Sequence, residues 1–435
     1  MGTINTGDTA FVLVAAALVM FMTPGLALFY GGMVRSKNVL GTVMQSVVAI
    51  GVVSLLWAVL GYSLAFGPDV GHVIGSLSWV GLHGVGQAPN ADYAPTIPAL
   101  AFMIYQGMFA VITPALITGA FAERMKFSSF VVFTALWTLL VYSPVAHWVW
   151  GTGGWIRQLG ALDFAGGTVV HISSAAAALA AAFVVGRRKG FGKEVMHPHN
   201  VPMTVLGACI LWFGWFGFNA GSALGANGLA ANAFVVTHLA AAAAGLSWAA
   251  AEWIHQKRPT TLGAASGAVA GLVAITPASG FVGPLSAILI GIGAGVLCYL
   301  GVLLKWRLRY DDSLDVVGVH GVGGIFGALA TGLLAQQVIN AAGANGAFFG
   351  NPVLLLKQAV AVLAVIAWSF GLSYGLLRAI RAVMGVRVES DEEELGLDLS
   401  QHNETAYAFG SSSGRIHYDE RVAASPVLVE PSGVV

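Results

Sequence analysis

Two histidines lie inside apolar stretches of this 435-residue chain. His171 ends the sequence Gly-Gly-Thr-Val-Val-His, and His320 lies in Val-Gly-Val-His-Gly-Val-Gly-Gly. Two neutral imidazoles can share one hydrogen bond, with one ring donating and the other accepting. Histidine is also suited to a proton relay, because it gains and loses a proton near neutral pH. A single buried histidine is more often a packing residue bonded to a backbone carbonyl, and we expect that simpler role for His238.

Metal binding is the competing chemistry for this histidine pair. Zinc requires three or four nitrogen, oxygen or sulfur ligands, and no third ligand is expected at the same depth. Cys209 and Cys298 are the two cysteines, and both lie in apolar runs, which argues against a disulfide framework. No arrangement of nucleophile and base is evident either. The sequence therefore predicts no metal, no cofactor and no enzymatic activity.

Aromatic residues gather near two predicted helix ends. Residues 212–218 carry two tryptophans and three phenylalanines and are followed closely by Ser222, while Trp148 and Trp150 end another apolar stretch. Such rings commonly form belts at membrane interfaces. The alternative is a cation site, because desolvated aromatic faces attract small cations by up to about 2 kcal/mol. A nearby hydroxyl would add an acceptor for an N–H donor.

The composition shows which elements position these residues. The chain is 57% hydrophobic and only 9% charged, and its mean hydropathy is +0.79. A soluble domain usually carries about 25% charged residues, so lipid must solvate much of this surface. Its formal net charge of zero argues against nucleic-acid binding. We therefore predict an all-α polytopic membrane protein, because lipid cannot satisfy an open strand edge.

About eleven stretches are long enough to span a bilayer, which requires about 20 residues each. The start, Met1 to Thr9, lacks Lys and Arg, so no cleavable signal is expected. The predicted spans are roughly 10–32, 41–66, 97–122, 129–150, 166–187, 201–221, 229–254, 261–279, 283–304, 317–336 and 354–384.

Basic residues concentrate in every other loop. The loops after the odd-numbered spans hold most of the lysines and arginines, such as Arg35, Arg124 and Arg188. By the positive-inside rule these loops are cytoplasmic. The prediction places the N-terminus outside and the C-terminus inside.

The spacing places both histidines near the bilayer midplane. His171 lies eight residues after Asp163, and His320 nine residues after Asp311. At ~1.5 Å per residue these are depths of ~12 Å and ~13 Å, from opposite sides. Half of the hydrocarbon core is ~15 Å. We therefore predict an inverted repeat, with spans 1–5 against spans 6–10 around a central pore where the two imidazoles face each other.

The predicted domain organisation has two parts. Residues 1–384 form the transmembrane domain, with repeat halves at about 10–190 and 200–340 and the eleventh span at 354–384. Residues 385–435 form a cytoplasmic, partly disordered tail that holds half of the acidic residues. The stretch Ser411 to Val435 has the composition of a disordered segment. The tail is either a simple solvated extension or a regulatory segment that docks on cytoplasmic loops.

Several ordered motifs give the chain a specific resemblance. Asp163 to His171, Gly214 to Ser222, Gly318 to Gly321, Leu28 to Gly32 and Gly119 to Arg124 resemble signatures of the Amt/MEP/Rh ammonium transporters, in the bacterial Amt branch. The resemblance covers about residues 10–407. One departure is Tyr105, which stands where phenylalanine is frequent in the family.

The resemblance implies roles for individual residues. It implies an ammonium recruitment site at Trp150, Ser222 and Phe109, and a gate of phenyl rings at Phe109 and Phe218, flanked by Trp215. It further implies a twin-histidine pore at His171 and His320. Asp163 is expected to shape the outer vestibule as a helix cap.

The resemblance also implies partners and a location. It implies a homotrimer with one pore per subunit in the plasma membrane, which is the inner membrane in bacteria. The expected substrate is ammonium or ammonia, with methylammonium as an analogue, and the expected cytoplasmic partner is a PII signalling protein.

A dry, phenyl-lined pore predicts how ammonium would be told apart from potassium. Moving an intact ion into it costs many kcal/mol, whereas ammonium can leave its proton behind and pass as NH3. We expect the proton to be relayed separately through the histidines. The alternatives are an electroneutral NH3 gas channel, and an ammonium sensor with little net transport.

Overall fold

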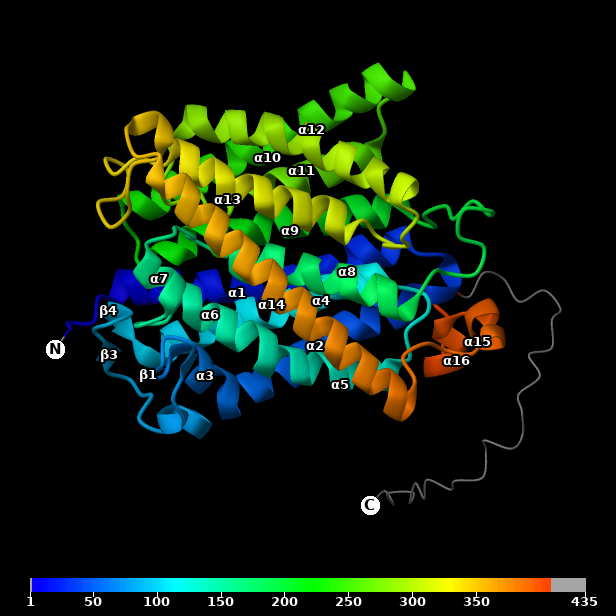
Figure 1. Cartoon of the computed structure of the whole chain (residues 1–435), viewed down its shortest axis with the longest axis horizontal. Helices are drawn as coiled ribbons and strands as arrows, with labels where there is room; N and C mark the ends of the chain where they lie inside the picture. The colour runs from blue at the N-terminus through cyan, green and yellow to red at the C-terminus, as the bar shows by residue number, and fades with distance from the viewer. Residues whose placement is uncertain (1, 408–435) are drawn as a thin grey trace, which may run out of the picture.

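The computed structural model describes residues 2–407, which form a bundle of long helices running between two faces (Figure 1). We call these the N-terminal face and the C-terminal face. The N-terminal face holds the start of the chain and two short antiparallel strand pairs, β1 (Asp69–Val70) with β2 (Ile74–Gly75) and β3 (Pro89–Asn90) with β4 (Ala94–Pro98). The C-terminal face holds two short helices, α15 (Ser390–Leu395) and α16 (Leu397–His402).

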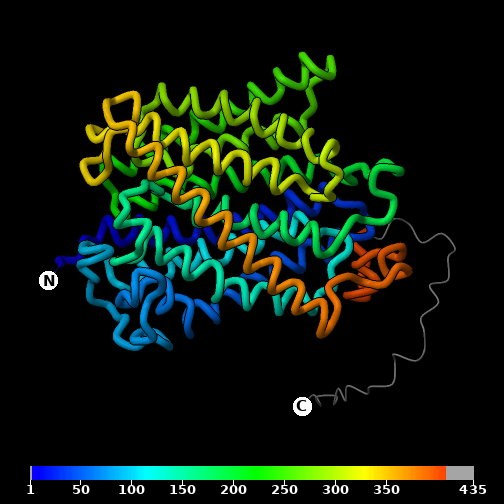
Figure 2. The backbone as a smooth tube through the Cα atoms, viewed as in Figure 1, coloured from blue at the N-terminus to red at the C-terminus, as the bar shows by residue number. Residues whose placement is uncertain are grey.

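Ten helical runs in the described part of the chain are long and apolar enough to cross a membrane. Their paths through the bundle can be followed in Figure 2. They consist of α1 (Thr6–Met33); η1 (Ser36–Asn38), α2 (Val39–Leu56), η2 (Trp57–Gly61) and α3 (Tyr62–Phe66); α4 (Ala99–Phe121); α5 (Phe127–Trp137), η4 (Thr138–Tyr142), α6 (Ser143–Trp150) and α7 (Trp155–Leu159); η5 (Gly167–Ile172) and α8 (Ser173–Val185); α9 (Val201–Ala220) and η6 (Gly221–Ala223); α10 (Gly228–Gln256); α12 (Pro284–Leu308); η7 (Val317–Gly321) and α13 (Val322–Leu334); and α14 (Val353–Met384). Two 3-10 turns, η3 (Leu77–Leu82) and η8 (Ala347–Phe349), lie in loops.

The predicted span at 261–279 is shorter than expected. Its helix, α11 (Thr261–Ile275), has 15 residues. At ~1.5 Å per residue that is ~22 Å, less than the ~30 Å hydrocarbon core. Residues 267–282, which include the turn after the helix, are buried in the bundle, where protein rather than lipid surrounds the backbone. The count of eleven spans and the orientation therefore stay predictions.

The outer surface of the bundle is apolar. Large side chains on several spanning helices are more than half exposed, among them Leu55, Leu246 and Leu285 at 71%, 75% and 72%. Water would disfavour so many exposed apolar side chains, whereas lipid solvates them. The bundle is therefore that of a multi-pass membrane protein.

The two predicted halves contact each other through their first and last helices. The first helix of each half, α1 and α9, pack along each other, and η5 and α13 contact each other. Gly207 on α9 allows this close approach, because a Cβ there would overlap the backbone nitrogen of Phe29 on α1. The histidine-bearing segments η5 and η7 are both π-helical, and they also touch each other. Such wide turns occur frequently at functional sites.

The beginning of the predicted tail is ordered and docked. The backbone N–H of Leu397 donates to Asn38 Oδ1 at 2.8 Å, and the buried Glu393 carboxylate accepts from the backbone N–H of Lys189 at 2.7 Å. Asn38 ends the short turn η1 and Lys189 lies in the loop after α8, both at the C-terminal face. The segment Ser411 to Val435, predicted as disordered, lies outside the described residues.

Candidate functional site

Asp163 fixes the start of the helical segment that carries His171. Its Oδ1 accepts the backbone N–H groups of Gly166 and Gly167, and its Oδ2 accepts that of Thr168, each at 2.7 Å. The Thr168 hydroxyl also donates to Oδ2. The first N–H groups of a helix have no partner inside it, so one carboxylate here satisfies several of them. Its oxygens are thereby occupied by the backbone.

The two imidazoles meet in the middle of the bundle. Nδ1 of His171 lies 3.2 Å from Nδ1 of His320, and the ring centroids are 5.3 Å apart. The residues are 1% and 4% exposed. One Nδ1 donates and the other accepts, so both rings can be neutral. The facing arrangement predicted from the spacing is therefore present, and Nε2 of His171 is buried with no partner among the described residues.

A column of aromatic rings leads from the histidines toward the N-terminal face. Phe218 lies 6.1 Å from the His171 ring and 4.3 Å from the Phe109 ring. Phe109 then meets Trp150 edge-on at 5.9 Å. Trp215 stacks on His171 at 5.5 Å, and its Nε1–H donates to Thr276 Oγ1 at 2.9 Å. The phenyl rings therefore separate the imidazoles from the outer end of the column.

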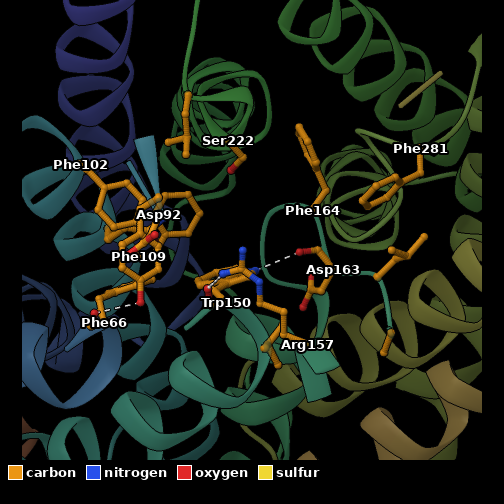
Figure 3. Close-up of a pocket in the computed structure, with 16 residues that line it drawn as sticks. Phe66, Asp92, Phe102, Phe109, Trp150, Arg157, Asp163, Phe164, Ser222 and Phe281 are labelled. Carbon is orange, nitrogen blue, oxygen red and sulfur yellow. Dashed lines mark hydrogen bonds between the residues drawn. The ribbon is translucent and has the colours of Figure 1, made fainter. Parts of the chain in front are cut away.

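A cavity of about 250 Å³ opens at the end of the column (Figure 3). Trp150, Phe109 and Ser222 all line it, so the structure brings the three expected recruitment residues together. Trp150 lies between Phe109 and Asp163 in Figure 3, and its Nε1–H donates to the Asp163 carbonyl at 2.9 Å. That bond holds the indole in place. The cavity thus combines aromatic surfaces with one hydroxyl.

The Ser222 hydroxyl is oriented by its neighbours. It donates to the Phe218 carbonyl at 2.9 Å, which leaves its oxygen free to accept. Tyr105, one helical turn before Phe109, places its hydroxyl 3.2 Å from Ser222 Oγ and 2.8 Å from the Phe218 carbonyl oxygen. The tyrosine that departs from the family pattern is fully buried and therefore adds a contact to Ser222, which lines the cavity.

Beyond the phenyl rings the space is narrow and mostly apolar. A cavity of about 10 Å³ is lined by both histidines, Trp215 and Phe218, with aliphatic residues of α1, α4 and α9. That is room for about one water-sized molecule. The site can therefore admit one small neutral molecule at a time, with imidazole nitrogens as its polar lining.

The cavities continue toward the C-terminal face. His320 also lines a cavity of about 30 Å³, which reaches Asp315. Asp315 in turn lines a larger cavity of about 490 Å³, with Lys305 and Trp306. Shared lining residues thus connect the histidines to the opposite face.

Buried ion pairs hold the loops around this second mouth. The Arg188 guanidinium donates to Asp311 Oδ1 at 2.9 Å and lies 3.4 Å from Glu123 Oε2. Burial alone would raise the pKa of the Glu123 carboxyl, but Arg188 and Arg35 hold that pKa below its usual value. Burial acts in the same sense on Asp311, where Arg124 and Arg188 keep the pKa low. Both carboxylates are therefore charged and paired.

Some cavity-lining residues were not expected from the sequence. Gln106, Arg157, Phe164 and Phe281 line the outer cavity, and the Arg157 guanidinium donates to the Trp150 carbonyl at 2.7 Å. Helical spacing could have pointed to Gln106, three residues before Phe109. The others come from loops and distant segments, for which the sequence carries no periodic signal.

Comparisons with known proteins agree on one family. Residues 10–407 match the model of the Ammonium Transporter Family. A Bacillus subtilis protein named ammonium transporter is 54% identical over 402 residues, covering 92% of this chain and 98% of the relative. Archaeoglobus fulgidus ammonium transporter Amt1 is 49% identical, covering 93% of this chain and all of the relative.

Solved structures show the same fold. The crystal structure of Candida albicans Mep2 matches with a TM-score of 0.85 and 37% identity, covering 90% of this chain and 88% of that one. A structure titled sensor Amt protein matches with a TM-score of 0.84 and 31% identity, covering 91% and 98%. With its ten apolar spans, the chain is a multi-pass protein of the plasma membrane, and it belongs to the ammonium transporter family.

Proposed function

We propose that the protein transports ammonium across the plasma membrane. The observation that carries the proposal is the row of sites between the two faces: an aromatic and hydroxyl cavity, a phenyl pair, and two facing imidazoles in a narrow apolar space. The names of the close relatives support the choice of ammonium as substrate.

Recruitment is assigned to the outer cavity. Ammonium is a small cation with four N–H donors. The faces of Trp150 and Phe109 attract its charge, and the Ser222 oxygen accepts one of its hydrogen bonds. Asp163 lines the cavity, but its carboxylate oxygens accept backbone N–H groups, so we assign it a structural role.

Deprotonation is assigned to the boundary between the outer cavity and the phenyl pair. The rings of Phe109 and Phe218 lie 4.3 Å apart and offer no hydrogen bonds to an ion. An intact cation would lose its hydration without replacement, at a cost of many kcal/mol. Ammonium avoids that cost by giving its proton either back to the outer solution or to the histidine pair beyond the rings, whereas potassium has no proton to give. The passage therefore selects by chemistry rather than by size.

The histidines then conduct the neutral molecule. The unpartnered Nε2 of His171 is free to exchange a hydrogen bond with NH3 in the narrow space. We propose that the proton travels separately along the bonded pair His171 and His320, which makes transport electrogenic. An electroneutral gas channel is the alternative, in which the proton returns to the side from which it came.

The wider organisation is also a proposal. We propose that the N-terminal face is outside the cell, that residues 1–384 form the transport domain, and that residues 385–435 form a cytoplasmic regulatory tail. The docked helices α15 and α16 support regulation through the C-terminal face. We further propose a homotrimer and a PII-type cytoplasmic partner. Mass measurement in detergent and co-purification with a PII protein test these two points.

A flux assay in proteoliposomes tests the proposed function. Purified protein should carry ammonium or methylammonium and exclude potassium, and replacement of both His171 and His320 by alanine should abolish this selective transport. His238→Ala is the matched control, because His238 lies on α10 away from the histidine pair. Equal ammonium and potassium flux in the wild type would reject the mechanism, and unchanged transport in the double variant would reject the role of the histidines.

An electrical measurement separates the alternatives. A current after an ammonium jump supports the relay, whereas uptake without current, with rising internal pH, supports the gas channel. A protein that binds ammonium without any flux would instead act as a sensor, like the neighbour titled sensor Amt protein.

A further inference from the structure

Asp315 lies where the inner passage opens toward the C-terminal face. It lines both the cavity of about 30 Å³ that contains His320 and the cavity of about 490 Å³ at the mouth. Its side chain is 29% exposed. A molecule that leaves the histidines toward this face therefore passes the Asp315 carboxylate.

Asp315 is held in an unusual backbone conformation. Its φ is +63°, in the left-handed region that residues with a side chain rarely adopt. Neighbouring hydrogen bonds fix it there: Leu314 N–H donates to the Gly119 carbonyl at 3.0 Å, and Val319 N–H donates to the Asp315 carbonyl at 2.9 Å. Seven other non-glycine residues of the described chain also have a positive φ, so this conformation orients the loop and does not by itself mark a site.

The partner of Asp315 is an alkylammonium group. The Lys305 side chain is only 8% exposed, and its Nζ forms an ion pair with Asp315. The same Nζ donates to the Asp312 carbonyl at 3.1 Å and lies 5.4 Å from the centre of the Trp306 ring. A carboxylate, a carbonyl and an aromatic face are the groups that bind a small ammonium ion.

The two guanidiniums near this mouth are already paired. Arg35 pairs with Glu123 at 2.7 Å, and Arg188 pairs with Asp311 at 2.9 Å. These guanidiniums therefore do not compete for Asp315, whose ion-pair partner among the described residues is Lys305.

We propose that Asp315, the Asp312 carbonyl and Trp306 form an ammonium-binding site at the C-terminal face, and that Lys305 occupies it as a tethered competitor. The inference rests on the proposed transport function and adds a second ion site to it. Substrate ammonium binds there by displacing the Lys305 amine, so the lysine sets the affinity of this face alone.

Membrane vesicles of opposite orientation test the proposal. Methylammonium uptake in right-side-out and inside-out vesicles gives a KM for each face. Lys305→Met removes the competitor, so the KM at the C-terminal face should fall by about fivefold, as expected for one partly exposed ion pair. The KM at the other face should not change. Asp315→Asn should raise the KM at the C-terminal face and leave the other unchanged.

Lys193→Met is the matched control, because Lys193 lies at the same mouth on an exposed position. Its KM values should equal those of the wild type. An unchanged KM at both faces in Lys305→Met, or an equal change at both faces, would overturn the proposal, even if Asp315→Asn fails to fold. Wild-type uptake together with no face-specific KM change in Lys305→Met would overturn this inference alone, whereas absent wild-type uptake would overturn the transport function itself.

Discussion

Removal of the Asp163 carboxylate should displace the helix that carries His171. In Asp163→Ala, the backbone N–H groups of Gly166, Gly167 and Thr168 lose their 2.7 Å acceptors. Each unsatisfied donor costs about 1–3 kcal/mol. Gly166, Gly167 and Thr168 are buried, but Asp163 lines the outer cavity, from which water can enter the space that its carboxylate leaves. We therefore take the lower end, about 3 kcal/mol in all.

The rate of uptake in Asp163→Ala should fall by more than the loss of folding stability alone would explain. A shift of the first turn moves His171 relative to His320, and misplacement of about 1 Å can cost about 100-fold where geometry controls a rate. We expect methylammonium uptake to drop by about tenfold or more in Asp163→Ala. Asp163→Asn should retain intermediate uptake, because one amide oxygen can still accept from Gly166 and Gly167.

The assay is uptake in proteoliposomes together with the thermal midpoint in detergent. Asp92→Ala is the control, because Asp92 lines the same outer cavity but is exposed. If negative charge in the cavity were what matters, the two alanine variants would lose uptake equally. Uptake within twofold of the wild type, with an unchanged midpoint, would refute the capping argument.

Three further perturbations address the C-terminal face. Arg188→Met leaves the buried Asp311 without its principal partner and should destabilise the protein by ~3–5 kcal/mol, seen as a lower thermal midpoint; an unchanged midpoint would contradict this. Burial and then the neighbouring acid raise the pKa of Asp312 from 3.8 to about 6, so its stability contribution is present below pH 3.8 and is lost as the pH rises through 6. Asp312→Asn should therefore be more stable than the wild type at pH 7, by up to about 3 kcal/mol, with a smaller advantage at pH 4; a pH-independent difference between the two midpoints would argue against this shift. Glu393→Gln should free the docked tail and speed its proteolysis. Glu394→Gln removes only an exposed ion pair with Lys189, which contributes little, and should not; equal cleavage of the two variants would show that the Glu393 carboxylate does not hold the tail.

The sequence predicted the helical scaffold and the contact between the histidines because both depend on simple spacing. Ten of the eleven apolar runs of bilayer length correspond to spanning helices in the described chain, and counting residues from Asp163 and Asp311 places His171 and His320 at matching depths. The aromatic cavity was also accessible, through the motif that ends at Ser222. Each of these features depends on short-range pattern.

Other features depend on long-range contacts that no pattern reports. The π-helical turns at both histidines and the short helix α11 are not visible in a short-range pattern, so the predicted eighth span, 261–279, was overestimated in length. The pairing of Lys305 with Asp315 joins a helix end to a strained loop residue. The docking of the tail could not be predicted, because the sequence does not show which loops lie at the same face.

The docked tail also has a consequence for biogenesis. Leu397 binds Asn38 across a sequence separation of 359 residues, and Glu393 binds the backbone of Lys189 across 204. The loops that connect the first helices can therefore reach their final arrangement only after residues 393–397 have been translated. A translation product that ends between Met384 and Glu393 would contain every spanning helix and still lack these two contacts between the tail and the loops.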